Sequence, residues 1–138
     1  MIPIVADHGA GRNNARRRFP SDVATIECHM LTHPAVLRPT DHADWRSDKM
    51  GKSTIYQSAR LLVGLNAFEP GQSHALHAHV GMDKMYYVLD GDGIFLLEGR
   101  EMPMQAGDLL VAPDGVPHGV KNTGKGRLLV LAVLAPAP

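Results

Sequence analysis

The sequence has few of the features that mark an exported or membrane-bound protein. Cys28 is its only cysteine, so no disulfide can form within the chain. No apolar run approaches the ~20 residues that span a bilayer. The N-terminus also lacks the basic segment followed by an apolar one that a secretory signal requires. These absences predict a cytoplasmic protein that makes no contact with a membrane.

An excess of charge is also missing, because 14 Lys and Arg residues balance 14 Asp and Glu residues. Electrostatics therefore gives no reason to expect a nucleic acid as a partner. Helical periodicity is equally scarce, since no stretch repeats apolar residues at a spacing of 3.6. Instead, fourteen glycines and ten prolines punctuate the 138 residues. Such dense punctuation favours many short strands joined by tight turns.

The chain divides into two parts of different character. Residues 1–50 begin rich in Gly, Asn and Arg and show no sustained period, which predicts an irregular N-terminal arm and lead-in segment. Residues 51–138 contain repeated apolar and β-branched runs separated by turn residues, which predicts an all-β domain built as a jelly roll. The expected strands lie within residues 59–68, 73–80, 84–91, 93–99, 100–105, 108–113, 117–122 and 126–135.

Three histidines in this domain have the spacing of a metal site. His77 and His79 are separated by one residue, so a strand places both on one face. His118 lies on a later strand that a jelly roll can bring opposite the first. Three imidazoles suit Zn, Fe, Cu or Ni, and Mn with carboxylate help, and they leave coordination positions open. His74 has the opposite parity to His77, which predicts a place at the pocket mouth or surface instead of a ligand.

The spacing of the glycines and prolines around these histidines is similar to that of a known protein family. Gly71, then His77 and His79, then Gly91 are spaced as in the first cupin motif. The run "GDLLVAPDGVPHGVKN", residues 107–122, fits the second cupin motif at every defined position. The sequence therefore resembles a small single-domain cupin over a little more than half of its length.

The resemblance implies a cupin-type jelly-roll barrel that is usually dimeric, so a homodimer is expected. It also implies a divalent transition metal, such as Zn, Fe, Mn or Ni, held by His77, His79 and His118. The barrel then acts on or binds a small organic molecule, and dioxygenase, isomerase and decarboxylase are the candidate reactions. The alternative is a non-catalytic binding or sensor cupin, with or without metal. The sequence does not decide whether the protein is an enzyme.

The sequence departs from the family at the acidic ligand. Counting back from Gly91, the glutamate of the motif falls at Lys84, whereas counting forward from the histidines it falls at Asp83. An ammonium about 4 Å from a dication would be repelled by roughly 8 kcal/mol at an effective dielectric near 20. Three interpretations stay open: a bulge turns Asp83 inward as a fourth metal ligand, or three histidines hold the metal alone, or Lys84 points inward in a metal-free pocket for an anion.

Overall fold

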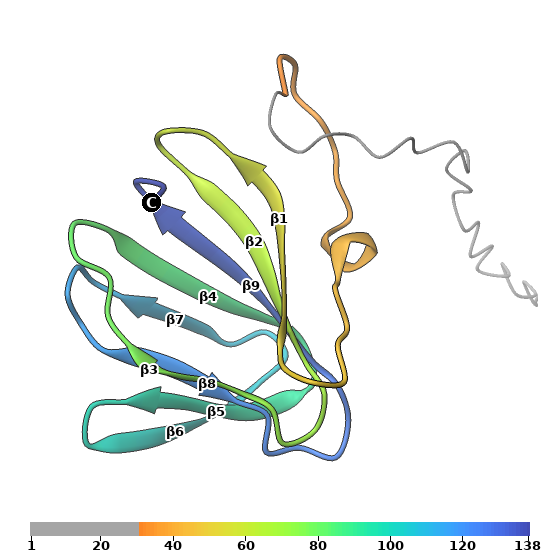
Figure 1. Cartoon of the computed structure of the whole chain (residues 1–138), viewed down its shortest axis with the longest axis vertical. Coiled ribbons are helices and arrows are strands. Elements are labelled where there is room, and N and C mark those ends of the chain that lie inside the picture. The colour runs from red at the N-terminus through yellow and green to blue at the C-terminus, as the bar shows by residue number, and fades with distance from the viewer. Residues whose placement is uncertain (1–30) are drawn as a thin grey trace, which may run out of the picture.

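The computed structural model describes residues 31–138, and the part of the predicted arm within residues 1–30 lies outside them (Figure 1). The described chain contains one short 3-10 helix and nine strands. In chain order these are η1 Pro39–His42, β1 Gly51–Gln57, β2 Leu62–Phe68, β3 Ser73–His77, β4 Asp83–Asp90, β5 Asp92–Leu97, β6 Arg100–Gln105, β7 Leu109–Ala112, β8 His118–Lys121 and β9 Leu128–Ala135. No helix in this part of the chain is long and apolar enough to cross a membrane.

The strands form two antiparallel sheets that face each other (Figure 1). One sheet has the order β1-β2-β9-β4-β7 and the other the order β3-β8-β5-β6, so the chain crosses repeatedly between them as in a jelly roll. Within residues 31–138 no strand pairing closes the two sheets into one barrel. All eight predicted strands are confirmed, and β1 is an additional strand whose sequence lacks a clear alternation.

The main core lies between the two sheets. Phe68, Tyr86 and Val130 from the larger sheet pack with Phe95 and Val120 from the smaller one. Strand β9 lies at the centre of the larger sheet, and its continuous apolar run fits a strand covered on both faces. Because side chains alternate between the two faces of a strand, every second residue of β4 and β9 points into the space between the sheets.

A second cluster covers the outer face of the larger sheet. Ile55, Leu65 and Leu129 are buried there beneath Leu37 and Trp45 of the lead-in segment. The prediction of an irregular lead-in did not anticipate this packing, because the contact joins residues distant in sequence and has no local period. The described part of the lead-in thus shields β1 and β2.

The same outer face stays apolar and uncovered where β7 forms the edge of the sheet. Tyr87 is 38% exposed, and its neighbours Leu109 and Val111 are 55% and 59% exposed. Alternation along β4 buries Tyr86 between the sheets and turns Tyr87 outward. Three large apolar side chains therefore meet solvent on this edge.

The tight connection between β4 and β5 depends on glycine. Gly91 has φ +86°, a conformation that L side chains rarely adopt. A Cβ atom added there would also collide with the backbone oxygen of Arg127. This explains in physical terms why a glycine closes the first motif.

Candidate metal centre

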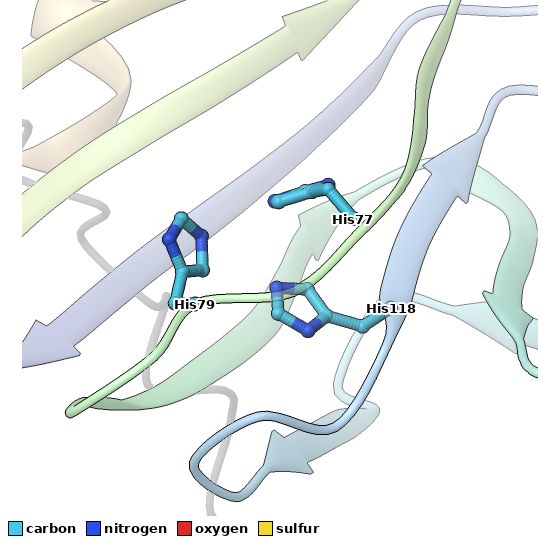
Figure 2. A group of neighbouring side chains, drawn as sticks. All are labelled: His77, His79 and His118. Carbon is cyan, nitrogen blue, oxygen red and sulfur yellow. The ribbon is translucent and has the colours of Figure 1, made fainter.

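His77 and His118 face each other across the β3–β8 pair. Their Cα atoms are direct partners in the antiparallel register, so both side chains project from the same face of the sheet. Their ring centroids lie 4.6 Å apart. Figure 2 shows both imidazoles pointing into the space between the sheets, where β8 brings His118 to the end of β3.

His79 joins them from the loop after β3. The predicted strand was too long, because β3 ends at His77. Two hydrogen bonds hold the loop against the β7–β8 turn: Gly115 N–H donates to the His79 carbonyl (2.8 Å), and Gly81 N–H donates to the Asp114 carboxylate (2.6 Å). The candidate ligand nitrogens of His77, His79 and His118 consequently lie within 4.8 Å of one another. The three predicted histidines are therefore brought together (Figure 2).

The backbone sets the tautomers of two of these rings. Nδ1 of His77 lies 2.7 Å from the carbonyl of Ala75, and Nδ1 of His118 lies 2.8 Å from that of Val116. A carbonyl only accepts, so each Nδ1 carries the hydrogen and each Nε2 keeps a free lone pair. Both Nε2 atoms are buried, and neither has a hydrogen-bond partner within residues 31–138. Unpaired acceptors converging at this distance fit a transition metal, which prefers neutral imidazole held in this way.

Burial keeps the three imidazoles neutral. It is the largest cause that lowers the pKa of His77 and of His118, and the nearby Lys84 ammonium lowers both further. The pKa of His79 falls to about 4, again through burial first and Lys84 second. A lowered pKa disfavours the imidazolium form, so each ring keeps one unprotonated nitrogen at neutral pH.

The structure places Lys84 inward and Asp83 outward. The register of β4 against β9 is regular at Asp83, Lys84 and Met85, so no bulge there reverses the alternation. The exposed Asp83 carboxylate accepts a hydrogen bond from Asp114 N–H at 2.9 Å and lies outside the three-histidine group. Its observed role is to fasten the start of β4 to the β7–β8 turn.

Lys84 is 5% exposed, a rare state for a lysine. Its Nζ atom lies 3.4 Å from Nε2 of His79 and 4.7 Å from the centre of the Tyr86 ring. Burial lowers the pKa of Lys84 to about 8, and the positive charge of Lys52 adds to the effect. The side chain remains mostly an ammonium at neutral pH.

A cavity of about 320 Å³ opens beside this cluster. Its lining combines two lysines, three histidines, an asparagine and several apolar side chains. The lining residues are Lys52, Ser53, Thr54, Leu62, Gly64, Leu65, Asn66, His74, His77, His79, Lys84, Ala132, Leu134 and Pro138. Among the described residues, no Asp or Glu side chain contributes to it. Lys52 and Asn66 were not singled out from the sequence, because one polar residue on a strand carries no spacing signal.

His74 also lines the cavity and is not one of the three grouped histidines, as predicted, but it does not lie on the opposite face of β3 from His77. The β3–β8 register shifts between His74 and His77, so a bulge places both on the inner face. Gly119 permits this close approach, since a Cβ there would lie 2.7 Å from the His74 carbonyl oxygen. His74 does not belong to the three-histidine group; its Nε2 lies 3.2 Å from Lys52 Nζ.

Two facing antiparallel sheets with three convergent imidazoles between them define a jelly-roll protein with a candidate metal centre. Residues 64–134 match the family described as "Cupin domain". The chain therefore belongs to the cupin family, as the two motifs around His77 and His118 indicated.

Relatives with known sequences or structures agree with this assignment. The oxalate-binding protein of Thermotoga maritima is 36% identical over 85 residues, which cover 62% of this chain and 69% of the relative. A crystal structure from Thermus thermophilus is 37% identical with a TM-score of 0.71, covering 75% of this chain and 98% of that one. The structure of a predicted oxalate decarboxylase from Thermotoga maritima is 28% identical with a TM-score of 0.64, covering 75% and 100%.

Proposed function

We propose that this cupin holds one divalent transition metal through His77, His79 and His118, and that the metal centre binds a small carboxylate in the adjacent cavity. The observation that carries the proposal is the pair of buried, unpartnered Nε2 atoms of His77 and His118. Zn, Fe, Mn and Ni are all candidates. With three protein ligands, the ion would keep open positions for a small molecule.

Two observations support a carboxylate as the ligand. The cavity contains Lys52 and Lys84 and no Asp or Glu side chain among the described residues, so an anion is electrostatically favoured. The curated protein and the solved structure from Thermotoga maritima that match this chain both have names that refer to oxalate, a small dicarboxylate. When bound, the metal would supply Lewis-acid polarisation of a carboxylate oxygen. The chain itself would orient the anion with Lys84, while Leu62 and Leu134 contribute apolar surface to the cavity wall.

We expect oxalate to bind the metal-loaded protein with a Kd below about 100 μM, and at least about tenfold more weakly once the metal is removed. Isothermal titration calorimetry of both forms measures this. Oxamide, a neutral analogue of similar shape, is the matched ligand control and should give no comparable heat. Equal oxalate affinity with and without metal would refute a metal-centred carboxylate site.

The same samples distinguish a binding protein from an enzyme. The geometry supports binding best, because no Asp or Glu side chain among the described residues lines the cavity to act as a general acid or base. An oxalate concentration that stays constant during long incubation supports this choice. Loss of oxalate, with or without oxygen consumption, would instead establish turnover as decarboxylase or dioxygenase.

We also propose that the chain is a homodimer that buries the apolar edge formed by Tyr87, Leu109 and Val111. Exposed apolar strand edges are normally covered by pairing. Sedimentation should give the mass of two chains for the wild type, and Val111→Asp should shift it to one chain. Met102→Asp, on the other sheet and 42% exposed, is the matched control and should leave the dimer intact. A monomeric wild type at high concentration would contradict the proposal.

A further inference from the structure

Lys84 is a buried cation, and no anionic side chain of the described residues pairs with it. Within that part of the chain, its ammonium contacts the His79 ring nitrogen and the face of Tyr86. Among residues 31–138, no carboxylate forms an ion pair with it. A buried charge is costly unless a counter-charge or hydrogen bonds compensate it. The buried ammonium of Lys84 would therefore be stabilised by an anion bound next to it in the cavity.

Lys84 also engages the nitrogen that a metal would need. An ammonium has donors and no acceptor, so Nε2 of His79 is the acceptor in the 3.4 Å contact with Nζ. Nε2 is the nitrogen that His77 and His118 leave free for the centre. For His79 the corresponding lone pair is occupied by Lys84. Metal ligation through this nitrogen therefore requires the ammonium to move away from it.

A second group of donors lies in the same cavity. Lys52 Nζ lies 3.2 Å from His74 Nε2, and because the ammonium must donate, Nδ1 of His74 carries a hydrogen. That Nδ1 and the Nδ2 of Asn66 are buried without a partner. Both residues line the cavity that Lys84 lines. These donors and the Lys84 ammonium line one cavity, so a small dicarboxylate there has hydrogen-bond donors available for both of its carboxylates.

We propose that Lys84 makes the three-histidine centre anion-dependent: a small dicarboxylate draws the ammonium off His79 and neutralises it, so that metal and dicarboxylate bind cooperatively. This inference rests on the proposed function, since it takes the three histidines as the metal site. Repulsion between the ammonium and a dication opposes metal binding when no anion is present. An anion between them removes that repulsion, and linkage requires that each ligand tighten the other by the same factor.

The test measures the Zn²⁺ affinity at neutral pH with and without saturating oxalate. The free Zn²⁺ concentration is fixed by a metal-ion buffer, so that Zn²⁺ complexed by oxalate in solution is accounted for. For the wild type, oxalate should lower the Zn²⁺ Kd by about tenfold or more. For Lys84→Met, the Kd without oxalate should already be about tenfold lower than in the wild type. Oxalate should lower it further by a clearly smaller factor than in the wild type, because only the direct contact between oxalate and the metal remains.

Lys121→Met is the matched control, because it removes the same charge from an exposed position at the end of β8. It should reproduce both wild-type constants. An oxalate effect as large in Lys84→Met as in the wild type, or a wild-type Zn²⁺ affinity that oxalate leaves unchanged, overturns the coupling through Lys84 while the three-histidine metal centre stands. If neither the wild type nor Lys84→Met binds Zn²⁺, the proposed function fails and the coupling fails with it.

Discussion

Replacing Asn122 with alanine should lower the free energy of unfolding by about 3 kcal/mol, since three hydrogen bonds of a buried side chain are lost and their partners are left unpaired. The side chain is fully buried at the end of β8. Its Nδ2 donates to the carbonyls of Phe68 (3.1 Å) and Gly126 (2.9 Å), and its Oδ1 accepts from Gly124 N–H (3.0 Å). One amide thus ties the end of β2 to the loop that leads into β9.

Urea denaturation of wild type and variant measures this loss as a shift of the midpoint at constant slope. Thr123→Ala is the matched control, because Thr123 is the exposed neighbour in the same loop, and it should change the stability by less than about 0.5 kcal/mol. A loss below about 1 kcal/mol for Asn122→Ala would show that the three bonds are replaced by water or by a shifted backbone.

The second large effect is expected at the metal centre. His118→Ala removes one of three ligands, and the remaining two imidazoles should bind Zn²⁺ about 1000-fold more weakly, a change of about 4 kcal/mol. Competition with a chromophoric chelator measures the affinity. Urea denaturation of the metal-free variant checks that the fold survives, since His118 is fully buried and pairs with His77 across the strands.

His33→Ala is the matched control for this prediction. His33 is exposed in the lead-in segment and lies outside the three-histidine group, so its loss removes a surface imidazole only. It should leave the Zn²⁺ affinity unchanged. A His118→Ala affinity within about tenfold of the wild type would mean that Zn²⁺ binds elsewhere on the chain.

Local sequence patterns were enough to predict most of the strands and part of the candidate metal site. Alternation and turn glycines act over a few residues, so they predicted the strands from β2 to β9 and the turn at Gly91. The spacing of His77, His79 and His118 predicted their convergence, because motif spacing fixes both the strand ends and the turns between them. The glycines and prolines of the second motif made that prediction specific to the cupin family.

Non-local contacts explain what the sequence left open or missed. The bulge that turns His74 inward is possible because Gly119 on another strand allows close approach, and no local period records it. A shift of one residue along β4 would exchange the directions of Asp83 and Lys84, and the sequence alone could not fix that register. The structure resolves it through the regular pairing of β4 with β9.

The metal content of the wild-type protein tests the central claim most directly. The chain should be purified without a histidine tag, incubated separately with Zn²⁺, Fe²⁺, Mn²⁺ and Ni²⁺ in the presence of oxalate, desalted, and analysed by mass spectrometry of the elements. The account predicts about one ion per chain for at least one of these metals, since one group of three imidazoles is available. A content near zero for all four metals would contradict it.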